Sequence, residues 1–344
     1  MEVYCGIDWA EQHHDVAVVD SAGRVLAQQR IGDDLAGFTA LSQVLDRLAS
    51  THGQVGIALE IDHGLFVHAL RDAGFRVFAI NPMAVDRYRD RYRVSRAKSD
   101  AVDALLLANL LRTDASRHCE IPADSEQAVV VSVLARAQQD AVRERRRQTA
   151  RLRSALREFY PAVLRAFPDL TTKTALTVLS AAPSPGQALG LTRDDLHALA
   201  RSCRRWGITL REVTRLHQVL HQPQLRQAPS VEQAMGTVVL QLVLGLRILN
   251  LTIARLETEL AEQLNRHADT AILRSLPGVG VVLAGRMLSE FGDDPARFTN
   301  VASRRDYAGT APITKASGKG RVVLLRRSVT PACSTPAGTG RSAR

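Results

Sequence analysis

The segment VYCGID, residues 3–8, decides the fold of the first part of the chain. It is a short run rich in β-branched and aromatic residues, which favours a strand, and it carries Asp8 within the apolar pattern. Two similar runs, 16–19 and 25–27, flank the turn-forming sequence DSAG at 20–23. We therefore expect three adjacent strands, with a hairpin between the last two.

Helical and strand patterns alternate from there to about residue 112. An amphipathic stretch at 35–48 leads to a fourth strand at 55–60, and another at 65–73 leads to a fifth strand at 76–80. This alternation is typical of a mixed α/β domain, which we place at residues 1–122. In a hairpin-first topology, the first and fourth strands are expected to be parallel neighbours.

Strand signals end past Pro122, and long helices are expected instead. Residues 128–160 predict an arginine-rich helix, and residues 231–266 predict a second one. Apolar residues of the second helix recur at alternating spacings of four and three, which fits either a coiled-coil seam or an intramolecular bundle: Leu242, Leu246, Leu249, Ile253, Leu256 and Leu260. We expect a helical connector with a coiled coil at 123–270, a small helical domain at 271–327 and a disordered tail at 328–344.

The charge balance points to nucleic acid. The 344 residues carry a formal net charge of +10, which favours a polyanionic partner such as a phosphate backbone. Gln241, Arg247 and Asn250 interrupt the most apolar segment, and the first residues do not resemble a signal peptide, so we expect a cytoplasmic protein without a membrane partner. The four cysteines are far apart, which predicts reduced thiols rather than disulfides or zinc ligands.

Four carboxylates form the strongest chemical signal. Asp8 lies in the first strand, where an unpaired buried charge would be costly, and Glu60 ends the fourth. Asp100 and Asp103 stand three apart in a helix expected at 99–111, so they share a face. Converging carboxylates repel one another unless a divalent cation joins them, and hard oxygen ligands suit Mg²⁺ or Mn²⁺.

Each of these acids has an ordinary alternative. An isolated aspartate or glutamate is usually a solvated surface charge, and Asp100 and Asp103 could simply favour the helix dipole at a helix start. The ordered set, with two members on strands, favours a metal site for phosphoryl transfer.

The last part of the chain carries features expected to bind phosphate. The sequence LPGVG at 276–280, followed by an amphipathic stretch at 282–291, resembles a helix-hairpin-helix element, although a plain turn between core helices is an equal alternative. Basic residues outnumber acidic ones between Arg304 and Arg327. The residues expected to contact nucleic acid are Lys98, Arg143, Arg146, Arg147, Gly278, Gly280, Lys315, Lys319 and Arg321.

Several short motifs, in this order and spacing, resemble the DEDD transposases of the insertion sequence 110 family: GID at 6–8, LE at 59–60, INP at 80–82, KSDAVDA at 98–104, SLPGVG at 275–280, YAG at 307–309 and SG at 317–318. The resemblance implies an α/β domain of RuvC-like, RNase H-like fold followed by mainly helical parts. It also implies that Asp8, Glu60, Asp100 and Asp103 are metal ligands. One departure is IDHG at 61–64, where relatives often carry a small hydroxyl residue before the glycine.

The resemblance further implies a serine nucleophile and an RNA guide. Ser317, in a basic loop expected at 311–319, corresponds to the serine that attacks DNA and forms a phosphoserine link in this family. Family members assemble composite sites in oligomers guided by a structured noncoding RNA, the bridge RNA. We therefore expect donor and target DNA, a guide RNA and a homo-oligomer, a dimer or a tetramer, as partners.

Three other functions stay open from the sequence. A RuvC-like nuclease would need no serine. Relatives continue as further helices beyond the serine, so a truncated, inactive remnant that still binds nucleic acid is the second alternative. The third is an actin-like or sugar-kinase ATPase, because GID at 6–8 followed by VAVVDSAG at 16–23 also resembles the first phosphate loop of that class. Such an ATPase would need further glycine-rich loops, where this chain has arginine-rich helices.

Overall fold

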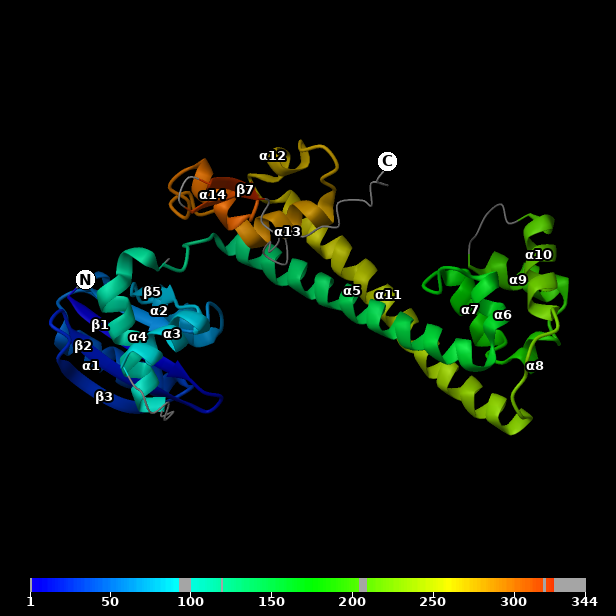
Figure 1. Ribbon diagram of the computed structural model, residues 1–344, viewed down its shortest axis with the longest axis horizontal. Coiled ribbons are helices and arrows are strands. Elements are labelled where there is room, and N and C mark those ends of the chain that lie inside the picture. Colours follow the sequence, from blue (N-terminus) through cyan, green and yellow to red (C-terminus); the bar gives the residue numbers. More distant parts are fainter. Residues whose placement is uncertain (1, 93–99, 119, 204–208, 318–319, 325–344) are drawn as a thin grey trace. The chain divides into compact units, whose positions relative to one another are not determined.

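A computed structural model describes residues 2–92, 100–118, 120–203, 209–317 and 320–324 (Figure 1). The chain divides into two units, Met1–Ala123 and Asp124–Arg344. The first is an α/β unit built on one sheet, and the second is almost entirely helical.

The first unit contains a five-stranded sheet in the order β3-β2-β1-β4-β5. Its strands are β1 (Val3–Trp9), β2 (His13–Asp20), β3 (Val25–Gly32), β4 (Val55–Leu59) and β5 (Arg76–Ala79). β1, β2 and β3 pair antiparallel, whereas β4 is parallel to both β1 and β5. The expected hairpin and the parallel pairing of the first and fourth strands are confirmed.

Local chemistry fixes the hairpin turn between β2 and β3. The Oδ1 atom of Asp20 accepts hydrogen bonds from the backbone N–H groups of Ala22 and Arg24, each at 2.9 Å. Gly23 has a φ of 84°, a left-handed conformation that glycine adopts without a steric penalty. Because this turn sets the register, each residue of β1 has a defined partner on β2.

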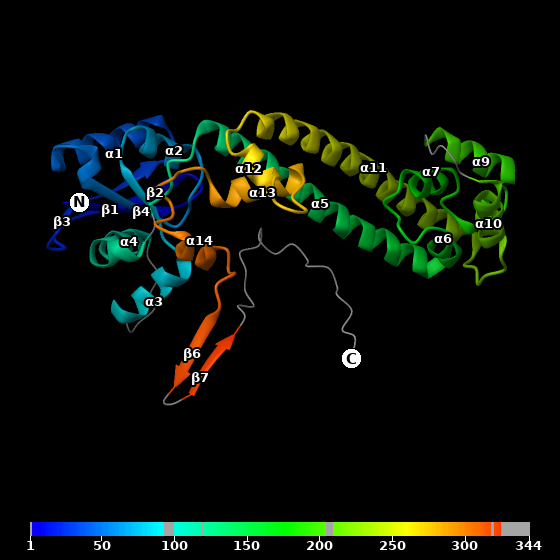
Figure 2. The same ribbon diagram turned by 90° about the horizontal axis from the view of Figure 1, so that it is seen from above.

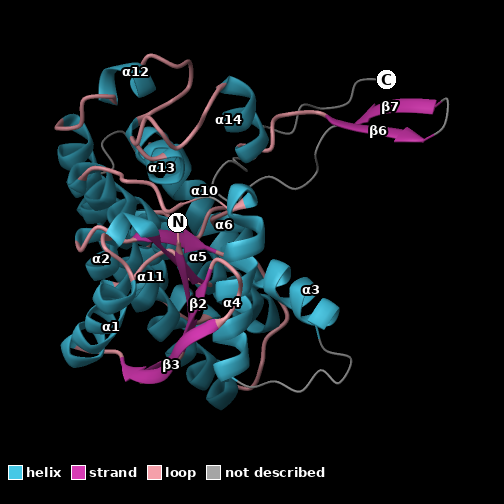
Figure 3. Ribbon diagram, turned by 90° about the vertical axis from the view of Figure 1, so that its left-hand side faces the viewer, coloured by secondary structure: helices cyan, strands magenta, loops and turns pink. Residues whose placement is uncertain are grey.

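The helices of this unit are α1 (Leu35–Leu48), α2 (Leu65–Asp72), α3 (Pro82–Tyr92) and α4 (Asp100–Asp114). They cover both faces of the sheet, and Figure 3 shows α1 and α4 on opposite sides of it. One face buries Cys5 and Ile7 with residues of α1 and α2, and the other buries Ala58 with Leu107 of α4. Each fully buried leucine or isoleucine stabilises the fold by roughly 1.5–3 kcal/mol.

Two long helices form the axis of the second unit. α5 (Glu126–Phe159) and α11 (Pro229–Asn265) lie side by side in Figure 2. They run antiparallel, since hydrogen bonds join Gln127 to Gln263, Gln138 to Glu257 and Arg145 to Asn250.

The predicted seam of α11 therefore packs within the chain. Leu246, Ile253 and Leu260 are buried. A coiled coil between protomers remains a prediction. Among the described residues, α11 alone is long and apolar enough to span a membrane by length and composition. Those two properties do not distinguish a span from a helix that packs inside a protein, and α11 packs against α5 and α13 (Val281–Phe291).

Short helices pack around one end of this pair and share a core with it. They are α6 (Pro161–Ala166), α7 (Lys173–Ala181), α8 (Pro185–Ala188), α9 (Arg193–Ser202) and α10 (Leu210–His221). At the other end follow α12 (Thr270–Arg274), α13 (Val281–Phe291) and α14 (Val301–Tyr307).

The expectation that no strand follows Pro122 is wrong. β6 (Ile313–Ser317) and β7 (Gly320–Leu324) form an antiparallel ribbon where a flexible loop was expected. The β-branched residues Ile313, Thr314, Val322 and Val323 favour strands, and the glycines and lysines between them masked this pattern.

Candidate active site

Asp8 and Glu60 lie at the carboxyl ends of neighbouring parallel strands. Gly6 of β1 pairs with Ala58 of β4, and each acid follows two residues later in the chain. Side chains two residues apart in a strand point to the same face. Asp8 therefore shares the face of Gly6, and Glu60, directly after β4, is expected to share that of Ala58. This is the face that α4 covers.

α4 runs antiparallel to β1 and brings its first turn to the same end of the sheet. A Cβ atom on Gly6 would lie 2.0 Å from the carbonyl oxygen of Ala104, so the two backbones are in direct contact. Further along α4, Arg112 donates a hydrogen bond to the Ser21 carbonyl in the hairpin turn, next to the start of β1. The start of α4 therefore lies toward the carboxyl end of β1.

Asp103 is a buried acid on this first part of α4, with 4% of its surface exposed. Arg89 of α3 holds it: the Nη2 atom lies 2.9 Å from Oδ1, and Nε donates to the same oxygen at 3.1 Å. Burial opposes the charged form of Arg89, but the negative charges of Asp103 and Asp86 outweigh burial and raise the pKa of the guanidinium. A buried carboxylate requires such a partner, because desolvating it alone is costly.

Asp100 is the first residue of α4, and its side chain lies outside the described part of the structure, as does all of Lys98. Among the described side chains, no three histidines, cysteines, aspartates or glutamates lie close enough to hold a metal ion. A metal site made by Asp8, Glu60, Asp100 and Asp103 therefore remains a prediction. The donor set fits Mg²⁺ or Mn²⁺, because every ligand would be a carboxylate oxygen.

Ser317 belongs to the second unit and ends β6. Its backbone pairs with Gly320, so it flanks the tip of the ribbon; Lys315 pairs with Val322, and Arg321 with Ala316. The side chains of these three predicted residues lie outside the described part, and Lys319 does so entirely. The predicted loop is wrong, because the serine stands on a strand.

The glycine-bearing turn before α13 is open to solvent. Gly278 has a φ of 78°, which favours glycine, and Gly280 immediately precedes the helix. No described atom lies within 4 Å of where a Cβ atom would stand on either glycine, so packing does not explain Gly280. α12 has only five residues, and the expected helix-hairpin-helix element is not confirmed.

The predicted phosphate-binding arginines of α5 are exposed. Arg143 pairs with Asp140 at 2.9 Å and Arg147 with Glu144 at 3.4 Å. Burial lowers the pKa of Arg286 on α13, and the charges of Arg143 and Arg146 lower it further. Positive charges on this stretch of α5 therefore act on a side chain of a neighbouring helix.

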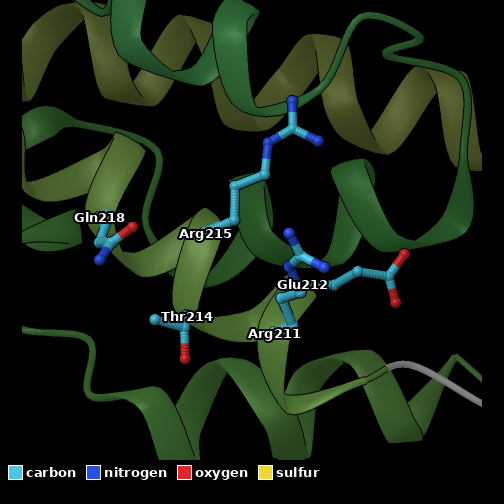
Figure 4. A pocket seen from close by; sticks show the side chains of 5 residues that line it. All are labelled: Arg211, Glu212, Thr214, Arg215 and Gln218. Carbon is cyan, nitrogen blue, oxygen red and sulfur yellow. The ribbon is translucent and has the colours of Figure 1, made fainter.

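A second basic surface lies on α10. A hollow of about 570 Å³ is lined by Arg211, Glu212, Thr214, Arg215 and Gln218 (Figure 4). Arg211 and Arg215 stand one helical turn apart and therefore share a face of α10. This hollow carries no predicted catalytic residue.

Sequence reasoning missed two residues beside the predicted ligands. Arg89 was missed because nothing in the sequence pairs it with Asp103. Asp15 lies opposite Asp8 on β2, and the position of the DSAG turn is the signal that could have identified it, since the turn sets the strand register.

Comparisons with known proteins identify the family. Residues 5–161 match a family model described as a transposase, and residues 270–329 match one described as a transposase of the IS116/IS110/IS902 family. A protein from Streptomyces coelicolor that carries the name mini-circle transposase for IS117 is 47% identical to this chain over 335 residues, which cover 95% of this chain and 80% of that protein. The 42 kDa protein of insertion element IS900 from Mycobacterium paratuberculosis is 27% identical over 92% of this chain and 79% of its own length. The chain therefore belongs to the IS110 family of transposases, enzymes that recombine DNA.

Proposed function

We propose that this transposase cuts and rejoins DNA with a divalent cation, Mg²⁺ or Mn²⁺, held by Asp8, Glu60, Asp100 and Asp103 in an RNase H-like, RuvC-like domain. The observation that carries the proposal is the convergence of two parallel strand ends and the first turn of α4 at one edge of the sheet. Asp8 lies on β1, Glu60 directly follows β4, and Asp100 and Asp103 lie on α4. Membership of a transposase family supports a catalytic role for this arrangement.

Side chains of the protein would bind the cation directly, and others would orient the side chains that bind it. When bound, the cation would stabilise the charge that develops on the phosphate oxygens during transfer. Arg89 pairs with Asp103 and fixes it on α4, so this acid is oriented before a cation or DNA arrives.

We assign the nucleophile to Ser317. Its hydroxyl oxygen would bond to a backbone phosphorus, the strand oxygen would leave with a proton, and the cut strand would stay attached as a phosphoserine. Attack by a hydroxyl of another strand end would reverse the step and rejoin DNA. The basic residues Lys315, Lys319 and Arg321, close in sequence, support a phosphate at this position.

Donor and target DNA and a structured noncoding guide RNA are the proposed partners, and the cytoplasm is the proposed compartment. The exposed basic residues of α5 and the open glycine turn before α13 support contacts with phosphates. A homo-oligomer is proposed because α11 exposes a second apolar stripe on the side away from its buried residues: Leu240, Leu244, Ile248 and Leu251.

The nucleophile is tested with purified protein, donor and target DNA and the flanking noncoding RNA in Mg²⁺. We expect covalent protein–DNA attachment with the wild type and none with Ser317→Ala. Ser50→Ala, an exposed serine of the first unit, is the matched control and should keep attachment. If attachment survives Ser317→Ala, the assignment is wrong, and if strand cleavage survives without attachment, a nuclease that needs no serine is favoured.

A further inference from the structure

Asp15 is a buried carboxylate directly across the strand pair from Asp8. The register of β1 and β2 pairs these two residues, and 8% of the surface of Asp15 is exposed. Directly opposite residues of an antiparallel pair point to the same face, with Cβ atoms about 4.5–5.5 Å apart. Asp15 therefore shares with Asp8 the face that α4 covers.

Arg30 holds Asp15 with two hydrogen bonds. It is the partner of Asp15 on β3, and its Nη2 atom lies 2.8 Å from Oδ2 while Nε donates to Oδ1 at 3.2 Å. This two-point contact fixes the plane of the carboxylate. Arg30 on β3, Asp15 on β2 and Asp8 on β1 therefore lie next to one another in one row across the sheet. The end of β4, which Glu60 follows, is the next position in this row.

Hairpin stability alone does not explain this pair. A partly exposed ion pair contributes little to stability, and like charges directly opposite on neighbouring strands are destabilising. At the other end of the same hairpin, Asp20 with Arg24 closes the turn, and its partner position on β1 is Val3, an apolar residue. Of these two hairpin pairs, the pair of Asp15 and Arg30 is the one that sets a second acid against a predicted metal ligand.

We propose that Asp15, held by Arg30, is a positioning residue of the metal site. This inference rests on the proposed function. Asp15 adds negative charge beside Asp8, and Arg30 both orients that charge and limits its strength. Neither residue is a ligand; together they set how strongly the edge of the sheet attracts a divalent cation.

The charges predict effects of opposite sign. Asp15→Asn removes one negative charge beside Asp8 and keeps the positive charge of Arg30, so cation binding weakens, by roughly tenfold or more as is usual for residues that support metal ligands. Arg30→Gln leaves the Asp15 anion uncompensated, so cation binding becomes tighter. The double variant removes one charge of each sign and should bind close to the wild type. A purely structural pair predicts weaker binding in all three variants.

The test is a Mn²⁺ titration of the full chain without nucleic acid, read by electron paramagnetic resonance of the free ion. Asp20→Asn is the matched control, since it removes the same charge from the far end of β2 and should leave affinity unchanged. Circular dichroism verifies folding. If Asp15→Asn does not fold, Arg30→Gln and the double variant still decide.

Asp8→Asn, measured in the same series, separates this inference from the proposed function. If Asp8→Asn binds Mn²⁺ as tightly as the wild type, the proposed metal site itself is wrong. If Asp8→Asn loses binding while Asp15→Asn and Arg30→Gln both match the wild type or both weaken, only the positioning role is overturned.

Discussion

Gly6 shows how a missing side chain brings the candidate site together. Because this residue has no Cβ atom, the backbone of α4 can contact β1, and Asp103 is carried to the end of the strand that bears Asp8. The glycine of the GID motif is thus explained by a close approach between a helix and a strand rather than by a turn.

We predict that Gly6→Ala destabilises the first unit. The new Cβ atom would lie 2.0 Å from a carbonyl oxygen of α4, and backbone atoms cannot give way as a flexible side chain can. Forcing atoms into a packed core costs about 1–3 kcal/mol or more. Urea unfolding measures this loss, and Gly53→Ala is the matched control because no described atom lies within 4 Å of its Cβ position. Equal stability of Gly6→Ala and the wild type would refute the close contact.

The ion pair of Arg226 and Glu232 makes the stability of the second unit depend on pH. Arg226 donates to both carboxylate oxygens of Glu232, at 2.5 and 2.6 Å. These hydrogen bonds lower the pKa of Glu232 from its usual 4.5, although burial opposes the shift. An acid whose folded pKa is lowered contributes stability above its unfolded pKa and loses it as pH falls through the folded value.

We therefore expect Glu232→Gln to lower the melting temperature near pH 7, and the difference from the wild type to shrink as pH falls below about 4.5. Because Arg226 is partly exposed, solvent screening keeps the effect modest. Differential scanning calorimetry across pH gives the measurement. Glu262→Gln, an exposed acid on the same helix, should leave the melting temperature unchanged. A difference that stays constant with pH would contradict the ion-pair account.

At the scale of elements, α11 has more apolar surface than its partner helices bury. Leu244, Ile248 and Leu251 are 53%, 56% and 71% exposed and form one stripe. We predict that Leu244→Glu combined with Ile248→Glu dissociates the proposed homo-oligomer and leaves the melting temperature nearly unchanged, because these side chains contribute little to the chain's own core. Sedimentation velocity measures the mass. Thr258→Glu, exposed further along the helix, is the control, and an unchanged mass for the double variant would exclude this stripe as the contact.

Elements differed in how well the sequence predicted them. Strands β1 to β5 and helices α1 and α2 followed from local patterns, because strong alternation and clear turn residues agreed there. The short helices α6 to α10 were not resolved as separate elements, since residues 161–228 lack a long periodic pattern and depend on a shared core. The ribbon of β6 and β7 was missed because its strands are short and interrupted by charge.

At the scale of the whole molecule, the sequence predicted which acids to examine but not what surrounds them. Asp8, Glu60 and Asp103 follow from strand ends and helix spacing. Their neighbours Arg89 and Asp15 come from other elements, and only tertiary packing and strand register bring them close. Long-range contacts of this kind leave no local signal.

The net charge of +10 predicts a salt-dependent interaction with nucleic acid. Removing one cation that neutralises a phosphate should reduce the slope of log affinity against log salt by about 0.9 for duplex DNA. We expect Arg146→Ala, exposed on α5, to weaken binding across sequences and to reduce that slope by about one. Fluorescence anisotropy at several salt concentrations gives both values. Arg24→Gln is the control, since Arg24 pairs with Asp20 in the hairpin turn. An unaltered slope for Arg146→Ala would show that Arg146 does not contact a phosphate.

We propose that carboxylates at one edge of the sheet hold the cation needed for DNA recombination. The most direct measurement is the yield of recombined DNA in Mg²⁺ for the wild type and for Asp8→Asn, with Asp20→Asn as a charge-matched control and all three proteins verified to be folded. We expect products with the wild type and Asp20→Asn and only background with Asp8→Asn. Wild-type yield from Asp8→Asn would contradict the role of this carboxylate in holding the cation.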